Sequence, residues 1–99
     1  MNEHTQPVAL DKAYRLINHG PTVLVSARHA GVDNVMAAAW ACGLDFSPPK
    51  VTVVIDKIAA TRGLIEQSGY FVLQVPTVVQ AALTTRLGTT TLASDPEKL

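Results

Sequence analysis

The sequence contains almost no cysteine, and its other shortages exclude several classes of protein. Cys42 is the single cysteine among 99 residues, so the chain can form neither an internal disulfide nor a cysteine-based zinc site. No apolar run approaches the roughly 18 residues of a membrane-spanning helix. Yet 47% of the residues are hydrophobic, which is too many for an intrinsically disordered chain. The composition therefore predicts a small soluble protein with a hydrophobic core.

An excess of charge of either sign is also lacking. Eight Lys and Arg residues balance eight Asp and Glu residues. Without a basic surface, neither nucleic acid nor an anionic membrane is an expected partner. Glu3 and His4 stand where a secretory signal would have a basic start, so we expect the cytoplasm. The length predicts a single domain, residues 1–99, whose small core a partner subunit would help to stabilise.

Hydrophobic periodicity predicts a helix and a β-hairpin in the first half of the chain. Apolar residues at three- and four-residue spacing predict a helix over residues 9–18, which ends before Gly20. Residues 22–27 and 34–41 read as two strands with a glycine-containing turn between them. Residues 43–49 include two adjacent prolines, so we expect a loop there.

Strands and helices alternate in the second half. The apolar, β-branched residues 50–56 predict a strand that is covered on both faces. Thr61 is the expected cap of a short helix that Gly69 ends. Residues 70–75 predict a fourth strand, bounded by a proline.

A last helix and an unfinished one are expected towards the C-terminus. Thr77 and Gln80 form a capping-box pair at the head of a helix for which Gly88 supplies the stop. Residues 94–97, Ser-Asp-Pro-Glu, then carry a helix-start signature, but only two residues follow. Our hypothesis is that the chain is the N-terminal part of a longer protein.

No familiar catalytic or metal-binding motif appears, and the three histidines are scattered. We therefore assign no catalytic residue and expect no metal. Cys42 lies just past a strand and is interpreted as a packing residue rather than a nucleophile. Trp40 is either a core anchor or a platform for an aromatic ligand; taken alone, the core is favoured.

One segment has the composition of a phosphate site. The strand over residues 50–56 leads through a loop to the expected cap at Thr61, with Arg62 beside it. Amides at a helix N-terminus, the Thr61 hydroxyl, and the cations of Lys57 and Arg62 can converge on one anion. The alternative is that Thr61 only caps the helix and both cations are solvated. The residues by themselves favour this alternative.

A family resemblance is carried by residues 34–76, which read NVMAAAWACGLDFSPPKVTVVIDKIAATRGLIEQSGYFVLQVP. The segment resembles the flavin reductase-like proteins of the FMN-binding split-barrel superfamily, particularly the flavoredoxin-type branch. The shared features are an Asn-x-Met opening, a small-residue strand with Trp40, a double proline, a β-rich strand, and a Thr-Arg pair shortly after Lys57. With the preceding segment, the resemblance extends over residues 9–88.

The resemblance implies a mainly β fold with flanking helices (α+β), namely a six-stranded antiparallel Greek-key split barrel. Such proteins are usually homodimers that hold FMN at the subunit interface. It implies that the flavin ring lies along the small-residue strand and that the phosphate is held after the next strand. The implied cofactor-binding residues are Asn34, Met36, Ala38, Ala39, Trp40, Ala41, Cys42, Asp56, Lys57, Thr61 and Arg62.

Two features depart from the family's pattern. Many members have serine or threonine where this chain has Ala37, Ala39 and Cys42, which makes backbone contacts to the flavin more important. The family's domain is also nearly twice this length. With four predicted strands, the barrel is expected to be incomplete in this chain and to leave open edges.

The leading functional interpretation is an oxidoreductase of the flavin reductase type. In it, NAD(P)H reduces bound FMN, and the flavin passes electrons to another flavin, a small molecule or a redox-partner protein. Because the cofactor does that chemistry, the absence of a conspicuous acid, base or nucleophile fits this interpretation. Two alternatives stay open: a non-catalytic flavin- or haem-type binding module, and an inactive truncated remnant.

Overall fold

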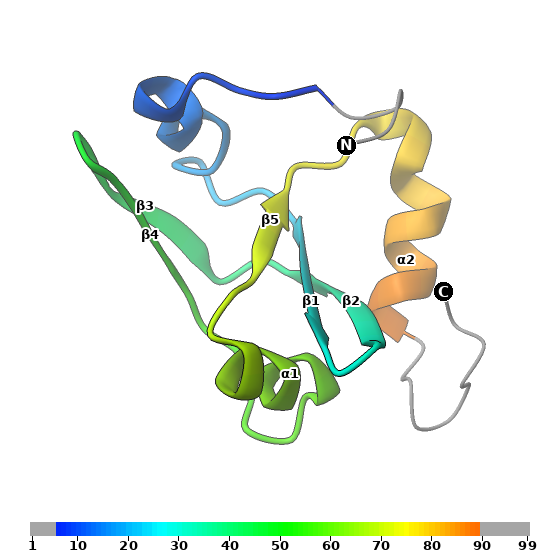
Figure 1. Cartoon of the computed structure of the whole chain (residues 1–99). Helices are drawn as coiled ribbons and strands as arrows, with labels where there is room; N and C mark the ends of the chain where they lie inside the picture. Colours follow the sequence, from blue (N-terminus) through cyan, green and yellow to red (C-terminus); the bar gives the residue numbers. More distant parts are fainter. Residues whose placement is uncertain (1–5, 90–99) are drawn as a thin grey trace.

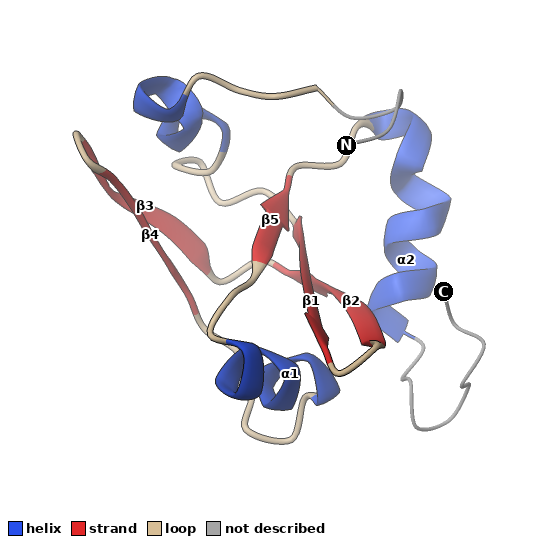
Figure 2. Cartoon of the chain, in the orientation of Figure 1, coloured by secondary structure: helices blue, strands red, loops and turns tan. Residues whose placement is uncertain are grey.

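Five strands form two antiparallel sheets, and two α-helices pack on the larger sheet (Figure 1). The computed structural model describes residues 6–89. The elements, in chain order, are the 3₁₀ helix η1 (Leu10–Leu16), β1 (Val23–His29), β2 (Val32–Ala38), β3 (Ala41–Phe46), β4 (Pro49–Val53), α1 (Ala60–Ser68), β5 (Val72–Gln74), the 3₁₀ helix η2 (Val78–Gln80) and α2 (Ala81–Thr89). Strand order is β2-β1-β5 in one sheet and β3-β4 in the other (Figure 2).

The hairpin of β1 and β2 confirms the predicted pair of strands, although the second strand ends at Ala38 rather than at residue 41. Ala30 and Gly31 connect the strands with positive φ angles of 51° and 81°. Two such residues make a tight turn whose twist matches that of the paired strands. β1 becomes the central strand, because Val25 lies opposite Met36 of β2 and opposite Leu73 of β5. The strand expected over residues 70–75 is therefore present but shorter.

The core lies where the two sheets and α1 meet. Its buried members are Ile17, Val23, Val25 and Ala41, and its partly buried members are Met36, Ala38, Val53, Ile55, Ile65 and Leu73. Every strand of the described chain contributes at least one of these side chains. The expected mixture of antiparallel strands and flanking helices is thus confirmed. Within residues 6–89 the strands form no closed barrel, and the Greek-key connection stays a prediction.

The first helix differs from its prediction. It is a 3₁₀ helix over Leu10–Leu16 rather than an α-helix, and no residue in it is buried. Of the expected apolar face, only Ile17, just past the helix, reaches the core. Short helical pieces that bury little surface commonly adopt the tighter 3₁₀ form.

Residues 43–49, expected as a loop, instead form most of a second hairpin. β3 and β4 pair antiparallel along their length, with Phe46 opposite Pro49. The prolines are tolerated because Pro48 lies in the turn and Pro49 opens β4, where a missing N–H breaks no interior ladder. Proline content alone was misleading here, since it excludes a central strand but not an edge strand.

β4 is not covered on both faces within residues 6–89, so that part of the prediction is wrong. Only Val53 among its residues is even partly buried. The inner side of the hairpin faces η1, where a Cβ added to Gly43 would meet the Tyr14 Cβ at 3.0 Å. Nothing in the described chain covers the outer side, where Val51 is exposed.

The last helix begins as predicted but does not end as predicted. The Thr77 N–H donates to Gln80 Oε1 at 2.9 Å, which confirms this capping pair. Gly88, however, lies inside α2 rather than after it. A Cβ at Gly88 would lie 3.0 Å from the Ala37 Cβ, so the glycine allows α2 to approach β2 closely. The helix start expected at residues 94–97 lies outside the described residues.

We expect Gly63→Ala and Gly88→Ala to have different effects on stability. At Gly63, in α1, an added Cβ meets nothing within 4 Å, so alanine should raise the free energy of unfolding by up to about 1 kcal/mol. At Gly88 the same gain is offset by the contact with Ala37. Urea unfolding followed by far-UV circular dichroism measures both. Equal gains at the two positions would show that α2 is not tightly packed on β2.

Candidate functional site

A buried hydrogen bond joins β2 to the start of α1. Asn34 Nδ2 donates to Thr61 Oγ1 at 3.0 Å, and the two residues are only 4% and 0% exposed. Asn34 Oδ1 is buried as well and has no hydrogen-bond partner among the described residues. Thr61 was expected to cap α1, but the N-cap is Ala59 and makes no side-chain bond. The cap prediction is wrong because the Thr61 side chain points into the protein towards Asn34.

Arg62 links α1 to the chain segment that follows β4. Its Nη1 donates to the backbone oxygen of Ile55 at 3.1 Å, and its Nε donates to Glu66 Oε1 at 2.8 Å. The guanidinium is therefore held in place by two bonds, one of them to a carboxylate one helical turn away. This geometry fixes the position of the charge, although Glu66 neutralises part of it.

Asp56 and Lys57 form the turn that leads into α1. Asp56 Oδ1 accepts the N–H of Ile58 at 3.1 Å, and the Asp56 carbonyl accepts the N–H of Ala59 at 3.1 Å. The Asp56 side chain thus shapes the turn. Lys57 is exposed, and no carboxylate within residues 6–89 forms an ion pair with it. Its ammonium group is available to an anion near the first turn of α1.

The small-residue segment lies at the junction of β2 and β3. Ala38 ends β2, Ala39 and Trp40 connect the strands, and Ala41 and Cys42 open β3. Ala41 is buried in the core, whereas Trp40 is 75% exposed. The interpretation of Trp40 as a core residue is therefore wrong.

Cys42 and Met36 lie in contrasting surroundings. Cys42 is exposed and does not pack as expected, because its side of β3 has no cover within the described chain. Met36 is partly buried against the core, so its side chain serves packing here.

Two hydrogen bonds connect the small-residue segment with the start of α1. The Trp40 carbonyl accepts the N–H of Val54 at 2.8 Å, and the next residue, Ile55, accepts the bond from Arg62. The small-residue segment is thus connected to the start of α1 through two consecutive residues. The Asn34–Thr61 bond forms a second connection between the same regions. The family resemblance implies both parts of the site, but neither of these two contacts can be recognised in the sequence.

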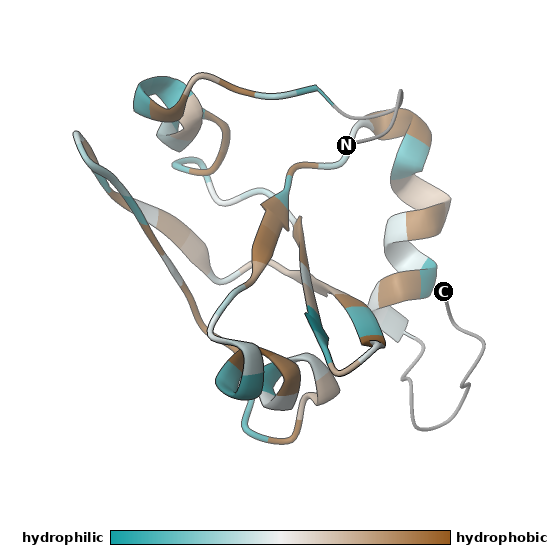
Figure 3. Cartoon of the chain, in the orientation of Figure 1, coloured by the Kyte–Doolittle hydropathy of each residue, from teal (hydrophilic) through white to brown (hydrophobic). Residues whose placement is uncertain are grey.

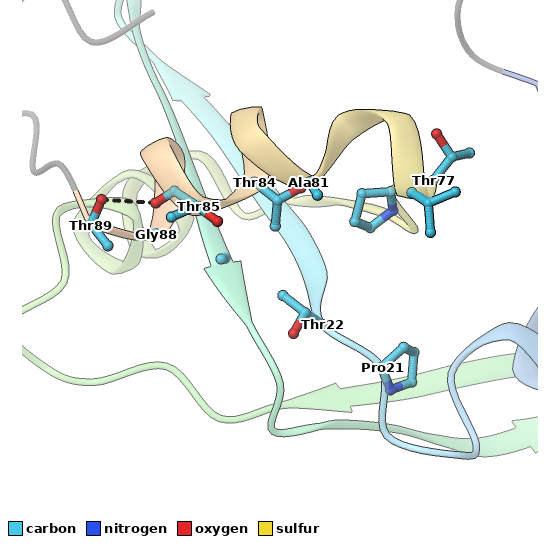
Figure 4. Close-up of a pocket in the computed structure, with 11 residues that line it drawn as sticks. Pro21, Thr22, Thr77, Ala81, Thr84, Thr85, Gly88 and Thr89 are labelled. Atoms are coloured by element: carbon cyan, nitrogen blue, oxygen red, sulfur yellow. Dashed lines mark hydrogen bonds between the residues drawn. The ribbon is translucent and has the colours of Figure 1, made fainter.

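A separate pocket of about 550 Å³ lies between α2 and the sheet (Figure 4). It contains none of the predicted cofactor-binding residues. Its lining residues are Pro21, Thr22, Ala37, Pro76, Thr77, Val78, Ala81, Thr84, Thr85, Gly88 and Thr89. The hydroxyls of Thr84 and Thr89 donate to carbonyls of the preceding helical turn. These two donors are already used, and we assign no ligand to this pocket.

Together these observations define an α+β domain in which exposed residues, Trp40, Cys42 and Lys57, lie at the junction of β2 with β3 and in the turn before α1. The chain belongs to the flavin reductase-like family, because the model of the flavin reductase like domain matches residues 14–98. This match confirms the resemblance found in the sequence.

Individual proteins agree with this assignment. The chain is similar to the FMN-binding domain of a flavin reductases-like enzyme from Shewanella baltica OS155, with 68% identity and a TM-score of 0.87 over 93% of this chain and 48% of that one. It is similar to the flavoredoxin of Desulfovibrio vulgaris (Miyazaki F), with 26% identity and a TM-score of 0.72 over 80% and 43%. It is also 43% identical to the uncharacterized protein YddH of Escherichia coli (strain K12) over 83% of this chain and 44% of YddH.

The chain therefore spans about half the length of the relatives that it matches, 48% of the Shewanella baltica chain and 44% of YddH. Two further observations concern its described part alone. Among residues 6–89, no group of His, Cys, Asp and Glu side chains has an arrangement that could hold a metal ion. The helices in this range are too short and too polar to cross a bilayer.

Proposed function

We propose that the chain is the FMN-binding part of an oxidoreductase of the flavin reductase type, with NAD(P)H as the electron donor. The observation that carries this proposal is the connection of Trp40 to Arg62 through Val54 and Ile55. It connects the small-residue segment, in which Ala39, Trp40 and Cys42 are exposed, to the start of α1 with its cations Lys57 and Arg62. A flavin mononucleotide requires this combination, because its ring is flat and largely apolar while its phosphate is an anion.

The residues present fit FMN in a definite way. Lys57 and Arg62 would hold the phosphate together with the first amides of α1. The backbone from Ala39 to Cys42 would lie along the ring, since its small side chains permit close approach and the Trp40 indole is exposed. Thr61 is fully buried, so we assign it a positioning role: its bond to Asn34 fixes the first turn of α1.

The chemistry of the reaction comes from the cofactor, which accepts a hydride from a nicotinamide and passes electrons on. The residues of this chain bind and orient the ring and neutralise the phosphate. We also propose a homodimer, in which a second copy covers the exposed surface at the start of β3, where Trp40 and Cys42 lie. A redox-partner protein and a cytoplasmic location stay predictions from the sequence.

Titration of the purified chain with FMN and with riboflavin tests this proposal. We expect FMN to bind with a micromolar or lower Kd, measured by quenching of flavin fluorescence, and riboflavin to bind more weakly because it lacks the phosphate. Size-exclusion elution of the same sample reports the oligomeric state. Equal affinities for FMN and riboflavin would contradict a phosphate site at Lys57 and Arg62.

Oxidation of NADH or NADPH by the FMN-loaded protein then tests the catalytic part. Consumption above the rate of free FMN is expected. Tight FMN binding without such consumption would instead indicate the non-catalytic binding module. Failure of the chain to bind any flavin would indicate an inactive remnant.

A further inference from the structure

Asn34 and Thr61 are the two polar residues that the described chain buries. Every other buried residue within residues 6–89 is hydrophobic. In this part of the chain the two side chains bond only each other, and Asn34 Oδ1 stays buried without a partner. A buried amide with an unused oxygen lowers stability relative to an apolar side chain of the same shape. Stability of the core alone therefore does not explain an asparagine at this position.

The surroundings of Asn34 would suit an apolar residue. Asn34 lies opposite Ala27 in the register of β1 with β2, and Ala27 is buried. α1 packs on both strands through Leu64, which is buried, and Ile65, which lies against the core. Figure 3 shows hydrophobic and hydrophilic residues alternating along α1, as in a helix with one packed side. A polar pair inside such an apolar contact fixes one arrangement among the several that apolar packing tolerates.

The bond from Asn34 acts on the first turn of α1. Thr61 is the second residue of this helix, whose N-cap, Ala59, makes no side-chain hydrogen bond. Apolar contacts set how deeply α1 packs on the sheet. A hydrogen bond is directional, so the bond to Thr61 also sets how the helix is rotated about its axis. That rotation determines where the first amides of α1 and the neighbouring Arg62 side chain point.

We propose that Asn34 is a positioning residue that determines specificity for a phosphate-bearing flavin. Asn34 and Thr61 are too deeply buried to touch a ligand, so they act through the amides of the first turn and through Arg62. This role rests on the proposed function, in which that turn binds the phosphate of FMN. The site then distinguishes FMN from riboflavin only while the Asn34 bond keeps the turn in its orientation.

The double variant Asn34→Leu with Thr61→Val separates positioning from stability, because it removes both polar partners and keeps apolar packing. We expect the ratio of the Kd for riboflavin to the Kd for FMN to fall at least about fivefold. Both constants are measured by quenching of flavin fluorescence. Thr61→Ser keeps the hydroxyl and should retain the ratio of the unaltered chain. Thr61→Val alone should lower the ratio as well, so the test does not depend on the double variant.

Amide hydrogen exchange provides a readout that needs no flavin. The amides of residues 62–65 bond to carbonyls of the first turn, as the Arg62 N–H does to the Ala59 carbonyl at 3.1 Å. In the double variant these amides should exchange at least about fivefold faster, whereas those of residues 66–69 should keep their rates. Thr52→Val, on the exposed side of β4, is the control and should change neither the exchange rates nor the ratio of affinities.

Two results would overturn this role of Asn34. One is a folded double variant with an unchanged ratio and unchanged exchange at residues 62–65, because the pair would then only fill the core. The other is equal weakening of FMN and riboflavin, which would mean a general loss of shape. Equal affinities of the unaltered chain for the two flavins would instead contradict the phosphate site itself. The exchange rates would then still show whether Asn34 fixes the first turn of α1.

Discussion

Replacement of Thr61 by valine is expected to lower the free energy of unfolding by about 1–3 kcal/mol. Valine has nearly the same shape, so packing is retained while the hydroxyl is lost. The Asn34 amide then loses its bond from Nδ2, and its Oδ1 is already without a partner among the described residues. A fully buried amide without hydrogen bonds carries the full cost of its desolvation. Urea unfolding followed by far-UV circular dichroism measures the loss.

Thr52→Val is the matched control for this experiment. Thr52 is exposed on β4, so the same change should alter the free energy of unfolding by less than about 0.5 kcal/mol. The double variant Asn34→Leu with Thr61→Val should recover part of the loss, because it removes both polar partners. A loss at Thr61 no larger than at Thr52 would show that the Asn34 bond does not hold β2 to α1.

The parts of the fold that were predicted correctly depend on local rules. The hairpin of β1 and β2 follows from two strand-like runs around a glycine at position 31, which adopts the positive φ that the turn requires. Gly69 ends α1 in the left-handed conformation for the same reason. Thr77 and Gln80 interact across one turn. Each of these features depends on residues that are close together in the chain, so it can be recognised from the sequence alone.

The wrong predictions concern positions whose local structure depends on contacts with distant parts of the chain. Pro49 opens an edge strand because no third strand needs its N–H within the described residues. Gly88 lies inside α2 because β2 approaches it closely, and the approaching residue, Ala37, is 51 positions away in the sequence. Glycine and proline each have several structural uses, and local sequence does not show which one applies.

In the candidate site too, local patterns can be recognised from the sequence, whereas contacts between distant residues cannot. The local pattern of a helix start with nearby cations indicates Lys57 and Arg62 as candidates, but by itself it favours solvated side chains, and only the family resemblance turns the pattern into a predicted phosphate site. The partner of Thr61 was not predicted, since Asn34 lies 27 residues earlier in the chain. For Trp40 taken alone, the core is favoured over a ligand platform because large aromatic side chains are usually buried, and the structure shows it exposed instead. The family resemblance supplied the residues of the site, whereas the structure supplied their contacts.

Lys57→Ala is expected to raise the Kd for FMN at least about tenfold, which corresponds to about 1.4 kcal/mol. The Arg62 guanidinium already bonds the Ile55 carbonyl and Glu66, so part of its charge is neutralised. Lys57 has no such carboxylate among the described residues, and its full charge is available to the phosphate. The affinity is measured by fluorescence quenching of FMN on titration with the protein.

Riboflavin and Lys12→Ala provide the controls. Lys12 is an exposed lysine on η1, away from the start of α1, so its removal changes the net charge equally but should leave the Kd for FMN unchanged. Riboflavin lacks the phosphate, so Lys57→Ala should not weaken its binding. Added salt should weaken FMN binding to the unaltered protein more than to Lys57→Ala, because it screens the interaction that the variant has already lost. Equal weakening of FMN and riboflavin by Lys57→Ala would mean that Lys57 supports the shape of the turn before α1 rather than recognising the phosphate.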